Sequence, residues 1–90
     1  MKNDIRDIER MLKALANKRR LLILKCLYNV KRAIVGDIAK EIKLSFKATS
    51  KHLIILAAAN LIEKEQISLM MEYRLSDSLP AFAKSIIGNL

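Results

Sequence analysis

The chain contains few of the residues that mark disulfide-stabilised, collagen-like or turn-rich folds. Its 90 residues include one cysteine, one proline and two glycines, and only 4% are aromatic. A single cysteine cannot form an intrachain disulfide, which argues against a secreted, disulfide-stabilised domain. The shortage of glycine and proline argues against an all-β fold with many turns, and the 52% of hydrophobic residues argues against disorder. The composition therefore favours a compact, mainly helical domain.

Long apolar segments are also missing. The first ten residues, MKNDIRDIER, are highly charged and do not resemble a secretory signal peptide. The longest nearly apolar run, residues 53–62, is interrupted by Asn60 and is too short to span a bilayer. We therefore expect a cytoplasmic protein with no membrane partner. Residues 1–90 make one domain, near the size at which a single core is only marginally stable, so we expect a homodimer.

Acidic residues are scarce in the middle of the chain. Residues 10–60 hold twelve Lys and Arg but only two acids, Asp37 and Glu41, a net charge of +10 against +8 for the whole chain. A basic segment of this density favours a polyanionic partner, because Lys and Arg neutralise phosphates and release counterions. The alternative is a solvated cationic surface without a nucleic-acid partner.

Apolar residues recur at helical spacing in five segments of the chain. Asn17 and Ser45 can each accept a hydrogen bond from a first-turn amide, so they predict the starts of the second and fourth helices. Pro80 is typical of the first turn of a helix and opens the last one. The expected helices cover residues 4–15, 18–28, 34–44, 45–59 and 79–90.

Residues 61–75 show the alternation of apolar and polar residues that is typical of strands. The pattern predicts two strands that form a hairpin, or wing. The connecting stretch EQISLM contains no Gly, Pro, Asn or Asp, so the hairpin lacks the usual turn residues. A helix that continues through this region is the alternative.

The third and fourth helices are joined by a short link, which is the sequence form of a helix-turn-helix over residues 35–60. In that unit the second helix presents its N-terminal residues to base edges in the major groove. Lys47, Ser50 and Lys51 lie on the face opposite the apolar stripe. Lysine can donate to guanine or to phosphate, and serine can donate to either. The inward stripe comprises Thr49, Leu53 and Leu56.

Three segments resemble the ArsR-type winged-helix transcriptional regulators: LKALANKRRLLILKCL, VGDIAKEIKLSFKATSKHLIILAAANLIEKE and EYRLSD. The second matches a recognition unit that reads leucine-serine, a variable stretch, and then serine, a cation, histidine and leucine. The resemblance covers about residues 11–77 without a gap. The matching recognition-unit residues are Ser45, Ser50, Lys51, His52, Leu53 and Leu56.

The resemblance implies a mainly α winged helix-turn-helix with about five helices and a small β-hairpin, forming a homodimer through its first and last helices. The wing would cover about residues 61–75 and the dimerisation helix about residues 79–90. The expected base-reading residues are Ser45, Lys47, Ser50, Lys51 and His52. The expected phosphate contacts are Lys18, Arg19, Arg20, Lys40 and Lys43. The expected dimer interface comprises Ile5, Ile8, Leu12, Phe82, Ile86, Ile87 and Leu90.

The chain departs from the family pattern in three places. Metal sensors of the family use cysteine, histidine or carboxylate ligands in the third or last helix, and VGDIAKEI and PAFAKSIIGNL contain no cysteine or histidine. We therefore expect no metal and no cofactor, with Cys26 acting as a small buried hydrophobe. The wing has a net charge of −1 and an apolar tip at Ile67, Leu69 and Met70, which is poorly suited to phosphate. Phe46 replaces a polar residue, and we expect it to fold back onto the third helix.

These features predict a dimeric regulator that binds double-stranded DNA and inserts residues 45–59 into the major groove, with repression as the favoured output. An enzyme is not expected, because no constellation of an acid and a nucleophile surrounds His52 in the sequence, and groove contact explains Ser50 and Lys51 better. One alternative is a protein-interaction module that uses the apolar, acidic wing to bind a protein partner. Another is an RNA-binding winged helix, which the shortage of aromatic residues for base stacking disfavours.

Overall fold

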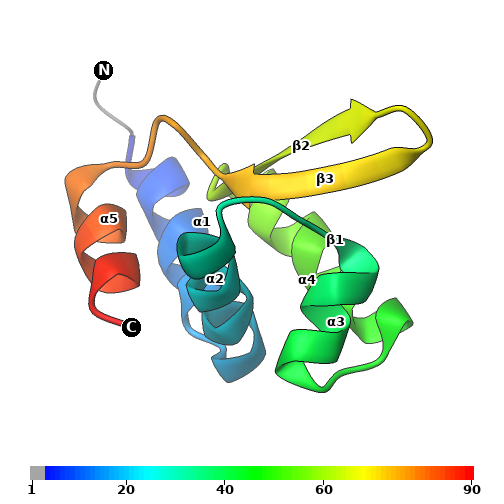
Figure 1. Ribbon diagram of the computed structural model, residues 1–90. Helices are drawn as coiled ribbons and strands as arrows, with labels where there is room; N and C mark the ends of the chain where they lie inside the picture. Colours follow the sequence, from blue (N-terminus) through cyan, green and yellow to red (C-terminus); the bar gives the residue numbers. More distant parts are fainter. Residues whose placement is uncertain (1–3) are drawn as a thin grey trace.

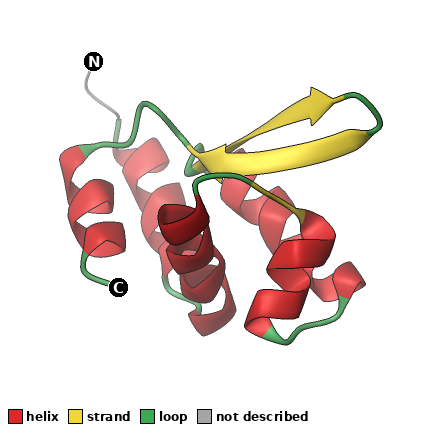
Figure 2. Cartoon of the chain, viewed as in Figure 1, coloured by secondary structure: helices red, strands yellow, loops and turns green. Residues whose placement is uncertain are grey.

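The computed structural model describes residues 4–90 and places five helices and three strands within them (Figures 1 and 2). In chain order these are α1 (Ile5–Leu15), α2 (Lys18–Val30), β1 (Ala33–Ile34), α3 (Val35–Ile42), α4 (Phe46–Ala58), β2 (Ile62–Ile67), β3 (Met70–Leu75) and α5 (Ala81–Gly88). This is a winged helix-turn-helix. The predicted fold class is confirmed, and the alternative of a continuous helix through residues 61–75 is wrong.

Side-chain caps fix the starts of three helices. The Asp4 carboxylate accepts from the Asp7 amide at 2.9 Å, and the Asn17 side-chain oxygen accepts from the Arg20 amide at 3.1 Å. The Ser45 hydroxyl accepts from the Ala48 amide at 3.1 Å and begins α4. Each bond satisfies a first-turn N–H that has no partner inside its own helix. The N-caps predicted at Asn17 and Ser45 are confirmed.

Helix α2 is the centre of the core. Its residues Ile23, Leu24 and Leu27 are almost completely buried, and it contacts all the other helices as well as β3. Helix α4 contributes the predicted stripe of Thr49, Leu53 and Leu56, all of which are buried. These residues are spaced by four and three positions, which places them on one face of the helix and leaves the opposite face of α4 outside the core. Helix α5 packs against α2, on the side of the bundle away from α3 and α4 (Figure 1).

The turn between α3 and α4 is closed without glycine. Lys43 takes a left-handed conformation with a φ of 57°, and the Leu44 amide donates back to the Ala39 carbonyl at 3.0 Å. This is the hydrogen-bond pattern that ends many helices, usually around a glycine or asparagine. Because Leu44 then packs against the core, the turn fixes the direction in which α4 leaves α3.

The wing is the outer part of a three-stranded antiparallel sheet with the order β1-β3-β2. Ile62 pairs with Leu75 at its base and Ile67 with Met70 at its tip. Ser68 occupies the two-residue turn with a φ of 57°, where glycine is usual. Strand β1 was not predicted: Ala33 was assigned to the link and Ile34 to the start of the third helix, whereas Ala33 pairs with Tyr73 and Ile34 with Glu72. The hairpin projects past α3 and α4, away from α5 (Figure 1).

The expected dimer-interface residues divide into three groups by exposure. Ile5 is 84% exposed, and Leu12, Ile86 and Leu90 are also exposed, so a second copy could cover them. Ile8 and Phe82 are half-buried. The assignment of Ile87 is corrected, because its side chain is 2% exposed and packs inside the protomer. The neighbouring core residue on α5 is Ala83, so α5 turns its Ala83–Ile87 face toward α2.

Candidate nucleic-acid interface

The face of α4 opposite the core carries polar and cationic side chains. Lys47 and Lys51 lie one turn apart and are exposed, and Ser50 beside them is half-buried. Neither lysine has an ion-pair or hydrogen-bond partner among residues 4–90. Ser45 uses its oxygen as the helix cap, and its hydroxyl hydrogen remains available for a donor role. The face can therefore donate several hydrogen bonds outward.

Further cations surround this helix. Lys18 and Arg19 lie in the first turn of α2, and Lys40 and Lys43 lie at the end of α3. All four side chains are exposed, and none forms an ion pair within the described part of the chain. Exposed cations that form no ion pair raise the local positive potential.

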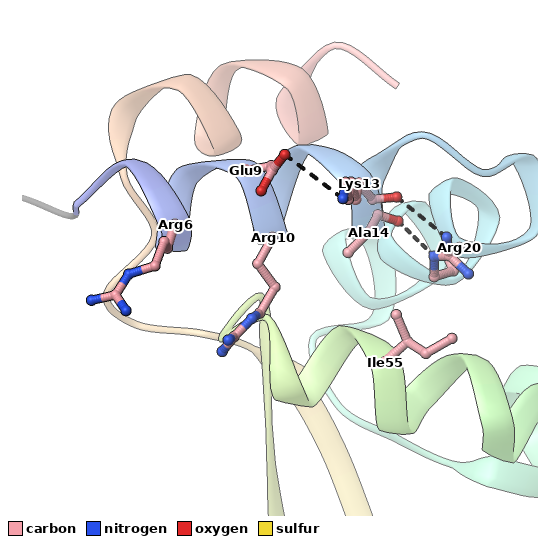
Figure 3. A pocket seen from close by; sticks show the side chains of 7 residues that line it. All are labelled: Arg6, Glu9, Arg10, Lys13, Ala14, Arg20 and Ile55. Carbon is pink, nitrogen blue, oxygen red and sulfur yellow. Dashed lines mark hydrogen bonds and ion pairs between the residues drawn. The ribbon is translucent and has the colours of Figure 1, made fainter.

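Arg20 has a structural role that differs from the predicted one. Its Nε donates to the Ala14 carbonyl at 2.6 Å and its Nη2 to the Lys13 carbonyl at 3.3 Å (Figure 3). These carbonyls lie in the last turn of α1, where the backbone oxygens have no partner within the helix. The third nitrogen, Nη1, lies 3.3 Å from Nδ1 of His52. Arg20 therefore joins α1 to α4, a role that was not predicted, and its role as a phosphate contact stays a prediction.

His52 is the residue of α4 that receives this contact. Arginine can only donate, so Nδ1 of His52 accepts, and the imidazole is neutral with its hydrogen on Nε2. Burial lowers the pKa of His52, and the charges of Arg20 and Arg19 lower it further. His52 faces α2 rather than the open side of α4. His52 positions α4 against Arg20, and its base-reading role stays a prediction.

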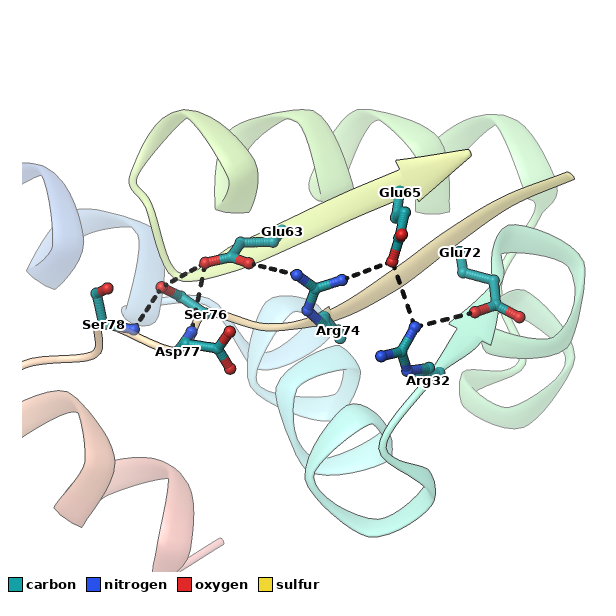
Figure 4. Close-up of polar contacts among 8 residues, drawn as sticks. All are labelled: Arg32, Glu63, Glu65, Glu72, Arg74, Ser76, Asp77 and Ser78. Atoms are coloured by element: carbon teal, nitrogen blue, oxygen red, sulfur yellow. Dashed lines mark hydrogen bonds and ion pairs between the residues drawn. The ribbon is translucent and has the colours of Figure 1, made fainter. Parts of the chain in front are cut away.

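The charges of the wing are paired with one another. Arg74 donates to Glu63 at 2.9 Å and to Glu65 at 3.0 Å, and Arg32 from the α2–β1 link lies 3.3 Å from Glu65 and 3.8 Å from Glu72 (Figure 4). Glu63 also accepts from the Ser76 hydroxyl at 3.2 Å. Each of the three acids of the wing therefore has an arginine partner within the protein. The sequence could not assign Arg32 to this network, because it lies 33 residues from Glu65.

The tip of the wing is uncharged and apolar. Leu69 is 95% exposed, and Ile67 and Met70 are exposed beside it. Phe46 is 63% exposed and lines a shallow hollow of about 240 Å³ with residues of the wing tip and of the start of α3. The expectation that Phe46 is folded back onto α3 is wrong, because most of its surface remains open. Phe46 joins the outward face of α4 to the wing tip.

The family of this chain is identified by a match to a family sequence model. The model described as "Bacterial regulatory protein, arsR family" matches residues 17–64, which is more than half of the chain. This chain belongs to the ArsR family. The match includes α2, the helix-turn-helix and the start of β2. The family is one of regulatory proteins, in agreement with the expectation that the chain is not an enzyme.

Solved structures of ArsR-type proteins align over nearly the whole chain. HlyU from Vibrio cholerae N16961 is 30% identical, over 99% of this chain and 92% of HlyU, with a TM-score of 0.80. The homodimeric winged helix-turn-helix DNA-binding domain of Mb0332 from Mycobacterium bovis is 26% identical, over 94% and 75%, with a TM-score of 0.81. The transcriptional repressor PagR of Bacillus anthracis is 25% identical, over 94% and 93%, with a TM-score of 0.80. No curated protein sequence matches the chain.

The remaining features to consider are metal ligands, the single thiol and the length of the helices. Between residues 4 and 90, no group of three or more His, Cys, Asp and Glu side chains is arranged to hold a metal ion. Cys26 is buried, and burial together with the charges of Glu41 and Asp37 raises the pKa of its thiol. A protonated, enclosed thiol is a poor nucleophile. No helix in the same range is long and apolar enough to cross a membrane.

Proposed function

We propose that this protein is a homodimeric transcriptional regulator that binds double-stranded DNA with α4 in the major groove and represses by occupying a promoter. The relatives support this reading, since one is a homodimeric DNA-binding domain and another a transcriptional repressor. A regulator of this kind acts where the chromosome is, which in a bacterium is the cytoplasm. The contacts to DNA follow from the faces of α4, α2 and α3.

The observation that carries the proposal is the distribution of paired and unpaired charge. The acids of the wing are held by Arg32 and Arg74, whereas Lys47 and Lys51 have no partner within residues 4–90. Phosphate neutralisation with counterion release would supply binding energy to cations left open in this way. A merely solvated helix face would need no such separation of the charges.

The side chains of the interface have two kinds of role. Lys47, Ser50 and Lys51 would reach base edges, because they lie on the open face of the first two turns of α4. Ser45 would add its hydroxyl hydrogen at the start of the helix. The contacts to phosphate would come from the exposed cations Lys18, Arg19, Lys40 and Lys43.

The second copy would be bound through α1 and α5. Ile5 and Leu12 on α1, Ile86 on α5 and Leu90 just after α5 are exposed apolar residues. Covering them would release the water that now contacts them. A two-fold dimer would place its two α4 helices in successive major grooves, about 34 Å apart. The operator would then be a two-fold symmetric sequence.

Fluorescence anisotropy with a random pool of duplex DNA tests the proposal. Wild type should bind, should weaken steeply between about 50 and 200 mM salt, and should enrich a two-fold symmetric site. The Lys47→Gln/Lys51→Gln variant should lose the enrichment, because these two lysines are the proposed base contacts.

The matched control is Lys25→Gln/Lys84→Gln, which removes the same charge from exposed positions on α2 and α5. It should keep the enriched site. The proposal is wrong if wild type fails to bind duplex DNA at low salt, or if both double variants lose affinity equally. Binding to single-stranded RNA in preference to duplex DNA would favour the RNA-binding alternative.

One observation favours a second candidate function, a protein-binding wing. The exposed apolar residues of the wing tip, above all Leu69, are of the kind that often marks an interaction surface. The paired acids, which lie nearer the base of the wing, would be next to such a contact. A Leu69→Ser variant that keeps full DNA affinity but loses regulation in cells would support this function.

A further inference from the structure

A cationic hollow lies between α1 and α4, away from the open face of α4. Its volume is about 410 Å³, and Figure 3 shows Ile55 rising from α4 toward α1. The lining contains four cations and one carboxylate, a net charge of +3, over the apolar side chains of Ala14 and Ile55. The charged lining residues are Arg6, Glu9, Arg10, Lys13 and Arg20.

The cations of the hollow are only partly neutralised. Lys13 lies 3.7 Å from Glu9, and Arg6 lies 3.4 Å from Asp4. Arg20 gives its N–H groups to two backbone carbonyls and to His52, none of which carries a negative charge. Arg10 has no ion-pair partner among residues 4–90. An anion in the hollow would therefore meet two guanidinium groups whose charge is not offset.

The hollow is displaced from the proposed base-reading residues. Ile55 follows Lys47 by eight residues and Lys51 by four, which places it about 12 Å and about 6 Å further along the helix axis, and roughly 80° and 40° around it. The hollow also opens between α1 and α4, whereas Lys47 and Lys51 lie on the face of α4 that no helix covers. The position favours a ligand other than the DNA whose bases α4 would read.

We propose that this hollow binds a small organic anion, a carboxylate or a phosphate monoester with a short apolar body. Arg10 and Arg20 would hold the anionic group, since guanidinium groups bind carboxylate and phosphate oxygens through paired N–H donors. The apolar body would lie on Ile55 and Ala14. The volume is in the range that holds small molecules in proteins.

Occupancy of the hollow would be transmitted to α4 through Arg20. The same guanidinium contacts His52, one position after Lys51 in the proposed recognition helix. An anion beside Arg20 would offset its charge and compete for its N–H groups, and so would weaken the contact with His52. The ligand and the operator would then influence each other's affinity reciprocally. This second step rests on the proposed function, whereas binding of the anion does not.

NMR of the full chain without DNA tests the site. The probes are hexanoate and hexyl phosphate, with 1-hexanol as the uncharged control and inorganic phosphate as the control without an apolar body. We expect both organic anions to shift the signals of Arg10, Arg20 and Ile55. We expect Arg10→Gln to weaken their binding roughly tenfold, which is the loss of one charge-assisted contact. Lys84→Gln, which removes an exposed cation on α5, should leave binding unchanged.

The titration of His52, the single histidine of the chain, measures the coupling between the hollow and α4. Arg19 and Arg20 of α2 are the cations whose charges lower the pKa of His52. A bound anion would offset the charge of Arg20, so the imidazole signal should titrate at a higher pH when hexanoate is saturating. An unchanged titration with bound hexanoate would show that the hollow is not coupled to α4.

Three results would overturn the proposal. In the first, neither organic anion shifts the signals of the hollow. In the second, 1-hexanol or inorganic phosphate binds as tightly as the matching organic anion, so that the charge or the apolar body contributes nothing. In the third, Arg10→Gln weakens duplex binding in ligand-free buffer as much as Lys47→Gln does, which assigns Arg10 to the DNA surface. The first two measurements contain no DNA, so their outcome is independent of the proposed function.

Discussion

Glu65 and Glu72 lie directly opposite each other on β2 and β3, and the guanidinium of Arg32 lies across both of them. Two carboxylates at opposing positions of an antiparallel pair repel each other. Nη1 of Arg32 offsets this repulsion at 3.3 Å from Glu65 and 3.8 Å from Glu72. Because Arg32 comes from the link between α2 and β1, the contact also ties the wing to the helices.

Replacement of Arg32 should loosen the wing. We expect Arg32→Gln to lower the free energy of unfolding by about 0.5–1 kcal/mol at low salt, because the side chains are partly exposed and such pairs are weak. Urea unfolding measures the change, which should shrink in about 1 M salt. Adding Glu72→Gln should restore part of the loss. Arg6→Gln, which removes an exposed pair with Asp4, should have almost no effect, and equal losses for the two variants would refute the role of Arg32.

Thr49 offers a test of the core beneath α4. Its side chain is 0% exposed, and its hydroxyl has no hydrogen-bond partner within the described residues. A buried hydroxyl without a partner costs free energy, and valine has nearly the same shape. We expect Thr49→Val to raise the free energy of unfolding by about 1 kcal/mol, measured by urea unfolding. Thr49→Ser keeps the hydroxyl and loses a methyl group, so it should be less stable than wild type by roughly 1 kcal/mol. A destabilised valine variant would mean that the hydroxyl is satisfied.

Local patterns in the sequence were sufficient for most of the fold. The caps at Asn17 and Ser45 and the buried position of Leu53 follow from interactions within one or two helical turns, which the sequence displays directly. Strand β1 has two residues, too few to show an alternation, and it is formed by backbone pairing with β3. The hairpin turn at Ser68 could not be recognised from its residue types, because it adopts a positive φ without glycine.

The candidate site was harder to predict because its key contacts join distant parts of the chain. Arg20 and His52 are 32 residues apart, and either residue alone is a reasonable DNA contact. Only their contact in the folded structure shows that they hold α4 against α2. The face of α5 that is buried was ambiguous for a different reason. Its apolar stripe is so wide that Ile86 and Ile87 are both plausible interface residues, and packing against α2 selects Ile87 for the core.

The neutral state of His52 should make stability depend on pH. Burial, followed by the charges of Arg20 and Arg19, holds the pKa of His52 below its usual value of 6.5. The unfolded chain therefore binds a proton first as the pH falls, and stability is lost as the pH decreases from 6.5 through the pKa of the folded state. Urea unfolding at about pH 7.5 and about pH 5.5 should show a larger loss for wild type than for His52→Gln. The carboxylates titrate in both proteins, so equal losses would show that His52 is not responsible.

The exposed apolar residues of α1 give the sharpest test of the dimer. Ile5 is 84% exposed and Leu12 is also exposed, so replacing them should not disturb the core of the protomer. We expect Ile5→Ser/Leu12→Ser to raise the dimer dissociation constant at least tenfold, since each removes apolar surface worth about 1.5 kcal/mol or more when buried. Sedimentation equilibrium measures the mass against that of the 10.2 kDa chain. Ile54→Ser removes an apolar residue of α4 that is 67% exposed and should leave the mass unchanged. A monomeric wild type would refute the dimer itself. A double variant that remains as dimeric as wild type would remove α1 from the interface and leave Ile86 of α5, and Leu90 after it, as the residues to test.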